Sequence, residues 1–266
     1  MTLNKVFIFF SLTLLLSCTK PAETKEEQLS VSELETETEQ PTTDSTINSI
    51  QGNVAWSQLS TAPNAVILTG LAEHRLVSVY KSRQAAKAAA EDPDAITFSY
   101  EKDEYDGDRS EKVSHFMPGL DILYGYNLLN IAHYDMKNEK LNFFFKRPAL
   151  VKTLYYPSFE QDSLHKEPIN RNYYLVSVYD EDSNKDTLIN KKDLRKFYHF
   201  DASSQLKTAL LPEHYSAIRS QYDPQNDAMY IFAIQDSNKN GQCEKKEPVH
   251  VFWIDLKIPM KAIRLY

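Results

Sequence analysis

The sequence predicts a mainly β fold of repeated antiparallel meanders, preceded by a leader and a linker. Three observations lead to this prediction. Short aromatic and β-branched segments alternate with polar turns, which is typical of strands. The pentapeptide Leu-Val-Ser-Val-Tyr occurs at both 76–80 and 175–179. An aromatic or apolar residue followed by aspartate also recurs, at Asp135, Asp201 and Asp255, each time ahead of another short strand-like segment.

Residues 1–17 have the features of a secretory signal peptide. Lys5 precedes an apolar run from Val6 to Leu16, which is shorter than the roughly 20 residues that a membrane-spanning helix needs. The tetrapeptide Leu15-Leu16-Ser17-Cys18 resembles the lipobox of bacterial lipoproteins. This resemblance implies cleavage before Cys18 and acylation of that cysteine, for example with palmitate. The alternative is a plain secretory signal peptide.

The lipoprotein resemblance implies that Cys18 anchors the chain to the outer membrane, facing either the periplasm or the cell surface. Several acyl chains give lasting attachment, whereas one alone binds marginally. Lys25-Glu26-Glu27 further resembles the acidic export signals of Bacteroidota lipoproteins, although a solvated charge cluster explains it too.

Residues 18–53 are expected to form a disordered acidic linker. They are rich in Glu, Thr and Ser and nearly free of aromatic residues, so they cannot bury enough apolar surface to offset their ordering entropy. Eight acidic residues against Lys20 and Lys25 give this linker a net charge of −6. With +1 from the leader and −7 for the whole chain, the rest carries about −2. Such a nearly neutral domain has no electrostatic footprint for nucleic acid.

The remaining residues, 54–266, are expected to form one β-rich domain. Within it, the loop 236–247 has oxygen-bearing residues at the spacing of a twelve-residue calcium loop: Asp236, Asn238 and Asn240 at positions 1, 3 and 5, the Gln242 carbonyl at 7, and Glu247 at 12. Gly241 supplies the turn at position 6, and Glu244 stands where a water is often held. A metal-free surface turn is the alternative.

A second loop of the same kind spans residues 182–193. Its proposed ligands are Asp182, Asn184 and Asp186 at positions 1, 3 and 5, the Leu188 carbonyl at 7, and Asp193 at 12, with Asn190 at 9. Thr187 replaces the turn glycine, and Asp193 is shorter than glutamate. We therefore expect this loop to bind calcium more weakly than its counterpart.

Both loops resemble the EF-hand loop, but their flanks do not resemble the EF-hand helices. The flanking segments 173–179, 194–201, 229–234 and 248–255 are predicted as strands. In the first meander, an insertion at about 81–130 takes the place of such a loop. It begins with a predicted helix at 82–90 and contains an acidic run at 103–108, which is expected to be a solvated turn.

Repeats of about 50 residues with this organisation resemble the blades of a β-propeller. Three copies are fewer than a closed propeller normally has, so a β-sandwich or an irregular stack remains an alternative. Cys243 has no disulfide partner once Cys18 is acylated, and it is expected to be a buried hydrophobe.

The sequence favours a non-catalytic function. We find no G-x-S-x-G, H-E-x-x-H, phosphate-binding or dinucleotide-binding motif. His133 and His199 occupy equivalent repeat positions, which favours a packing role. The leading hypothesis is a membrane-anchored lipoprotein in which calcium stabilises a binding or scaffold domain for an unidentified protein or glycan ligand. The alternative is a cell-envelope hydrolase, for example one that acts on glycans, with structural calcium.

Overall fold

The computed structural model describes residues 49–81, 117–125 and 128–266. The chain divides into two units, 1–40 and 41–266, and every described residue belongs to the second. Its backbone is mainly antiparallel β, and the predicted fold class is confirmed at that level. Four predicted features lie outside the described residues: the signal peptide, Cys18, the helix at 82–90 and the acidic run at 103–108. Within the described part, no helix is long and apolar enough to cross a membrane.

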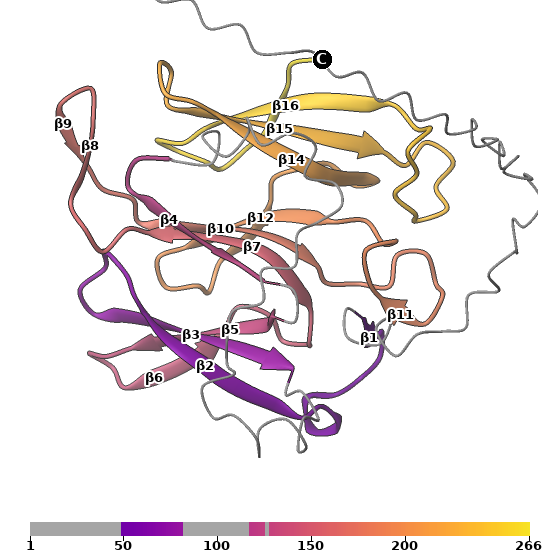
Figure 1. Ribbon diagram of the computed structural model, residues 1–266, viewed down its shortest axis with the longest axis horizontal. Helices are drawn as coiled ribbons and strands as arrows, with labels where there is room; N and C mark the ends of the chain where they lie inside the picture. Colours follow the sequence, from indigo (N-terminus) through magenta and orange to yellow (C-terminus); the bar gives the residue numbers. More distant parts are fainter. Residues whose placement is uncertain (1–48, 82–116, 126–127) are drawn as a thin grey trace, which may run out of the picture. The chain divides into compact units, whose positions relative to one another are not determined.

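Most of the described strands form three antiparallel sheets, which follow one another along the chain (Figure 1). The first sheet contains β2 (Thr61–Leu68), β3 (His74–Lys81), β5 (Leu128–Asp135) and β6 (Lys140–Phe143). The second contains β7 (Leu150–Pro157), β10 (Tyr173–Tyr179), β12 (Lys196–Asp201) and β13 (Lys207–Ala209). The third contains β14 (Tyr215–Asp223), β15 (Ala228–Gln235), β16 (Val249–Asp255) and β17 (Ile263–Arg264). Each of these sets is a four-stranded meander.

A fifth strand, β4 (Leu120–Tyr124), extends the second sheet by pairing with the outer edge of β7. It comes from the end of the insertion and was not predicted. Nor were β2, β7 and β14, the strands that begin the three meanders. Two smaller pairs complete the described strands: β1 (Ile50–Gln51) with β11 (Leu188–Ile189), and β8 (Asp162–Leu164) with β9 (Glu167–Ile169).

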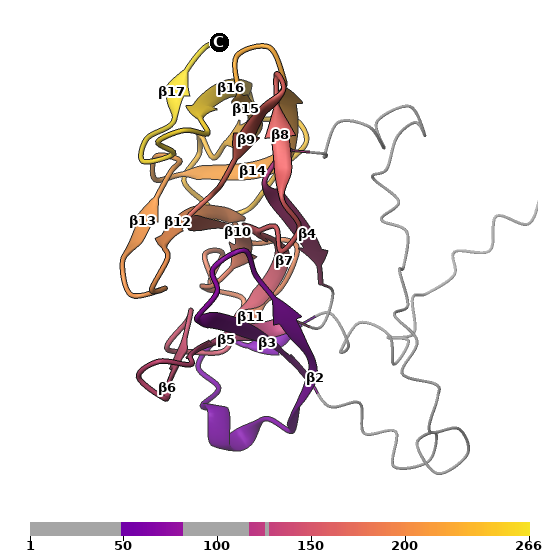
Figure 2. The ribbon, with the colours of Figure 1, turned by 90° about the vertical axis from the view of Figure 1, so that its left-hand side faces the viewer.

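The second sheet is buried on both faces, because side chains on its central strand alternate between two cores. Along β10, Tyr173 and Leu175 join a cluster shared with the third sheet, including Met229 and Ile254. Their neighbours Tyr174, Val176 and Val178 join a cluster shared with the first sheet. Because successive side chains of a strand point to opposite faces, the second sheet packs against the third sheet on one face and the first sheet on the other. Figures 1 and 2 show this order from two directions, with β10 and β7 between β16 and β3.

The recurring aspartates end the third strand of each meander and hold the turn that follows. A carboxylate oxygen of Asp135 accepts from the Lys137 N–H at 3.0 Å. Asp201 likewise accepts from Gln205 at 2.9 Å, and Asp255 accepts from Lys257 at 2.9 Å. Such bonds occupy backbone donors that a tight turn leaves free, which explains why the same residue type recurs at this point.

The folded domain begins before the predicted boundary at residue 54. Ile50 is 3% exposed and packs with Leu129, Leu150 and Ile189. The predicted linker, 18–53, therefore contributes β1 at its carboxyl end. This correction has a physical cause: β1 is only two residues long, and a polar neighbourhood hides its one buried apolar side chain.

His133 and His199 are both buried, at 1% and 7% exposed, at matching places in β5 and β12. The His133 ring stacks on His74 with centroids 4.8 Å apart, and the His199 ring lies 5.6 Å from Tyr173. Burial lowers the pKa of both imidazoles, and nearby His74 lowers the pKa of His133 further. These histidines therefore pack as neutral rings.

Acidification is expected to destabilise the domain through these two histidines. The unfolded chain protonates near its ordinary pKa of 6.5, while the folded chain resists protonation. Their contribution to stability is therefore complete above pH 6.5 and is lost as the pH falls below it. We expect the free energy of unfolding, measured in urea, to fall between pH 7.5 and pH 5.5. This fall should be smaller in a H133F/H199F variant than in the wild type. An exposed control, H165N, should lose as much as the wild type, and equal losses in all three proteins would contradict the assignment.

Candidate metal centre

The loops 182–193 and 236–247 occupy equivalent places in the second and third meanders. The first connects β10 to β12, and the second connects β15 to β16. The prediction of strands on both sides of each loop is confirmed. In the first meander, the corresponding connection between β3 and β5 is the insertion that carries β4.

Side chains at positions 1, 3 and 5 of loop 236–247 accept hydrogen bonds from the loop's own backbone. The carboxylate of Asp236, which is 2% exposed, accepts from the N–H groups of Asn240 and Gly241, each at 3.0 Å. Asn238 Oδ1 accepts from the Asn240 N–H at 2.9 Å. Asn240 Oδ1 accepts from the Gln242 N–H at 2.8 Å. The chain consequently curls around the side-chain oxygens of these three positions.

Loop 182–193 repeats this bonding position by position. Asp182 accepts from the N–H groups of Asp186 and Thr187 at 3.0 and 2.9 Å. Asn184 Oδ1 accepts from the Asp186 N–H at 3.0 Å, and Asp186 Oδ1 accepts from the Leu188 N–H at 2.9 Å. The two loops therefore share one internal bonding scheme despite their different sequences.

The two loops differ at position 12. Glu247 Oε1 accepts from the Ser237 N–H at 2.8 Å, whereas its buried Oε2 has no hydrogen-bond partner in the described residues. Both oxygens of Asp193 are occupied: Oδ1 accepts from the Ser183 N–H at 2.9 Å, and Oδ2 from the Asn190 N–H at 2.8 Å. Burial raises the pKa of Asp193, and the donors around it oppose that rise. An unsatisfied buried carboxylate oxygen is therefore found in loop 236–247.

Positions 7 and 9 are half-buried or exposed in both loops. Gln242 is exposed and Leu188 is half-buried. Glu244 Oε2 accepts from Asn238 Nδ2 at 3.3 Å, and Asn190 Oδ1 accepts from the Lys192 N–H at 2.8 Å. In the part of the chain that the structure describes, no three His, Cys, Asp or Glu side chains form a metal-binding group. A set of ligands for either loop would thus depend on asparagine and carbonyl oxygens as well as carboxylates.

The backbone takes the same left-handed turns in both loops. At position 4, φ is 61° for Lys185 and 58° for Lys239; at position 6, it is 74° for Thr187 and 75° for Gly241. This region suits glycine and strains a β-branched residue. The predicted difference at position 6 is therefore present as strain at Thr187 within an otherwise shared geometry.

The two loops also bind each other, which the sequence did not predict. Ser183 Oγ donates to the Gly241 carbonyl at 2.6 Å, and the Cys243 N–H donates to the Lys192 carbonyl at 3.1 Å. A Cβ on Gly241 would lie 1.9 Å from the Ser183 carbonyl oxygen. Cys243 itself is free and half-buried, so it is less buried than the predicted buried hydrophobe. Its backbone, more than its side chain, takes part in this contact.

The first described strand is attached to loop 182–193. The Gly52 N–H donates to the Thr187 carbonyl at 2.9 Å, and Ile50 pairs with Ile189 in the two-residue sheet of β1 and β11. A Cβ on Gly52 would come within 3.0 Å of Asp182. The segment that leads out of the linker is thus held directly against this loop.

Comparison with known proteins gives no family for this chain. No protein-family model matches it, and a search of curated proteins finds no relative with detectable sequence similarity. The functional interpretation therefore depends on the site itself.

Proposed function

We propose that the protein is a membrane-anchored calcium-binding lipoprotein in which calcium stabilises a β-rich binding or scaffold domain. The observation that carries this proposal is the bonding scheme shared by the two loops, together with the buried Oε2 of Glu247, which has no hydrogen-bond partner in the described residues. Buried carboxylate oxygens seldom lack a partner. A hard cation such as calcium would supply one, since it takes six to eight oxygen ligands.

Loop 236–247 would be the stronger site. Asp236, Asn238 and Asn240, the Gln242 carbonyl and Glu247 supply its oxygens, and Glu247 Oε2 is free to complete a bidentate carboxylate. Loop 182–193 would hold calcium through Asp182, Asn184 and Asp186, the Leu188 carbonyl and Asp193. There, the ion must compete with the N–H donors that already occupy both oxygens of Asp193.

The role of the ion would be structural. Calcium would offset the charge of the buried carboxylates and fix the loops that join the second and third strands of two meanders. Three face-to-face meanders in chain order support an open, propeller-like repeat, because a two-layer sandwich leaves one sheet unassigned. Attachment at Cys18 through the lipobox would place this domain outside the cytoplasm, where calcium is abundant enough to fill weak sites.

The hydrolase alternative has less support. One pocket of the described residues has no carboxylate in its lining. The other is lined by Glu167 and Asp227, and Asp227 is bonded to Arg171. Neither supplies two free acids facing a cleft, as glycan hydrolysis requires.

Calcium is expected to raise the melting temperature of the unacylated chain, residues 19–266. At 10 mM calcium and a dissociation constant on the order of 10⁻⁴ to 10⁻³ M, mass action stabilises the native state by about 1.4–2.7 kcal/mol. For a domain of this size, that is a rise of about 3–10 °C. Thermal melts with calcium, with magnesium and with chelator measure it, and magnesium should act more weakly.

Matched variants test whether the loops cause this shift. A D236N/E247Q variant should lose most of it, whereas D255N/E167Q, which removes the same charges outside the loops, should keep it. An unchanged shift in D236N/E247Q would refute the proposal, as would a wild-type melt that ignores calcium.

A further inference from the structure

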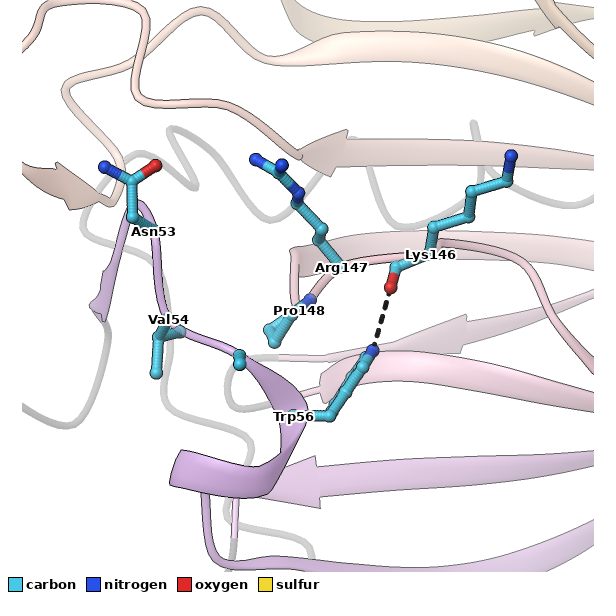
Figure 3. A pocket seen from close by; sticks show the side chains of 7 residues that line it. Asn53, Val54, Trp56, Lys146, Arg147 and Pro148 are labelled. Atoms are coloured by element: carbon cyan, nitrogen blue, oxygen red, sulfur yellow. Dashed lines mark hydrogen bonds between the residues drawn. The ribbon is translucent and has the colours of Figure 1, made fainter.

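A pocket of about 360 Å³ lies between the segment after β1 and the segment that joins β6 to β7 (Figure 3). Asn53, Val54, Ala55 and Trp56 form one side, and Lys146, Arg147 and Pro148 form the other. The pocket is separate from the two loops proposed to bind calcium. It combines an aromatic ring, two cations and an amide.

The side of the pocket that carries Trp56 is fixed by the protein. The Trp56 indole N–H donates to the Lys146 carbonyl at 3.1 Å, as Figure 3 shows, and the ring stacks on Phe143 with centroids 6.1 Å apart. Val54 and Trp56 pack against the buried cluster that includes Ile50. Because the indole N–H is already bonded, the ring offers a ligand its carbon face.

The opposite side is fixed by a buried asparagine. Asn130, which is fully buried, donates to the Phe145 carbonyl at 2.7 Å and accepts from the Phe145 N–H at 3.1 Å. The Ala149 N–H donates to the Leu129 carbonyl at 3.0 Å. Lys146 and Arg147 therefore extend from a backbone that is held at both ends, so the pocket needs little reorganisation on binding.

The cations of this pocket are available to a ligand. Lys146 and Arg147 are exposed, and no carboxylate lines the pocket. In the described part of the chain, neither side chain forms an ion pair or a hydrogen bond. The second pocket, of about 400 Å³, differs because its Arg171 is already bonded to Asp227.

We propose that this pocket binds an acidic sugar of a glycan, one that carries a carboxylate or a sulfate. A guanidinium binds such a group through two parallel N–H bonds, and the Lys146 ammonium adds a second charge. The carbon face of Trp56 packs on the apolar face of a sugar ring, and Asn53 bonds hydroxyl groups. An acidic peptide would satisfy the cations, but a carboxylate side chain has no ring face to place on Trp56.

Intrinsic fluorescence tests this assignment, because the chain has two tryptophans. In a W253F variant of residues 19–266, Trp56 is the sole tryptophan, and selective excitation of tryptophan reports on it. Titration with a hyaluronan hexasaccharide, in which glucuronate alternates with N-acetylglucosamine, should give a saturable change. Chitohexaose, a neutral chain of N-acetylglucosamine, should give none. Raising the salt concentration from 50 to 500 mM should weaken hyaluronan binding severalfold.

Charge variants localise the binding. Adding K146Q/R147Q to the W253F variant should weaken hyaluronan binding at least tenfold. The control K166Q/K261Q, which removes two exposed cations elsewhere, should change the affinity less than twofold. No saturable change, equal binding of chitohexaose, or full affinity in K146Q/R147Q would each overturn the proposal. A hexaglutamate peptide that binds as tightly as hyaluronan would overturn the choice of a sugar. The calcium-dependent melting shift does not depend on Lys146 or Arg147, so a failure of glycan binding leaves that shift unaffected and the two proposals fail separately.

Discussion

Replacing Arg171 with alanine is expected to destabilise the domain by about 3–5 kcal/mol, because this would leave a buried carboxylate unpaired. Arg171 and Asp227 are 5% and 2% exposed. The guanidinium donates to both oxygens of Asp227, at 2.7 and 3.1 Å, to the Leu256 carbonyl at 2.8 Å and to the Pro118 carbonyl at 3.2 Å. One side chain thus joins the start of β10, the turn between β14 and β15, and two further segments.

The same geometry predicts that a second substitution, at Asp227, restores part of the stability lost in R171A. Burial alone disfavours the charge of Arg171, and the bond to Asp227 offsets this, so the pKa of Arg171 lies above its ordinary value. Once the arginine is gone, the charge of Asp227 has no counterpart. R171A/D227N should therefore be more stable than R171A, since asparagine removes that charge and tolerates the left-handed φ of 54° at this position. Urea unfolding of both single variants and the double variant measures the coupling.

Additive losses would show that the two side chains act independently. A matched control is the exposed ion pair of Lys246 and Glu244, joined at 3.4 Å. The lysine side chain is 78% exposed and the glutamate side chain 26% exposed, so solvent screens the pair. K246A should cost less than about 1 kcal/mol, and a loss there equal to that of R171A would show that burial does not explain the effect.

The sequence predicted strands and turns that depend on neighbouring residues, but it did not predict which residues distant in the chain come into contact. The strands around both loops follow from aromatic and β-branched runs, and the turns follow from Asp135, Asp201 and Asp255. The strands that begin each meander were missed. In β7, for example, six of eight side chains are buried, so the alternation that identifies a half-buried strand is absent.

In the candidate site too, contacts within a loop could be predicted from the sequence, whereas contacts between distant residues could not. The spacing within each loop predicted which side chains curl inward, because every bond of that scheme joins residues no more than ten apart. The contact between the loops joins residues 58 apart in the chain, Ser183 and Gly241. Arg171 and Asp227 are 56 apart. Nothing in the local sequence around either residue identifies its partner, and pairs of this kind become visible once the sheets stack.

Gly241 takes part both in the turn within its own loop and in the contact between the two loops. Replacing it with alanine is expected to lower the free energy of unfolding by about 3 kcal/mol or more. A side chain at φ 75° costs about 1–2 kcal/mol in the left-handed region. The added Cβ would also lie 1.9 Å from a backbone oxygen of Ser183, which cannot rotate away. The loops would have to separate and lose the Ser183 and Cys243 bonds, each contributing about 0.5–1.5 kcal/mol.

Thr187→Gly is the matched control, because Thr187 occupies the same position of the other loop at φ 74°. Glycine relieves the strain there but adds freedom to the unfolded chain, so the net change should be stabilising by no more than about 1 kcal/mol. Urea unfolding with chelator and with calcium separates the two causes of loss in G241A. A loss that persists in chelator assigns the role of Gly241 to contact between the loops. A loss seen with calcium alone would contradict that role and assign it to metal binding, because loop-to-loop hydrogen bonds need no ion.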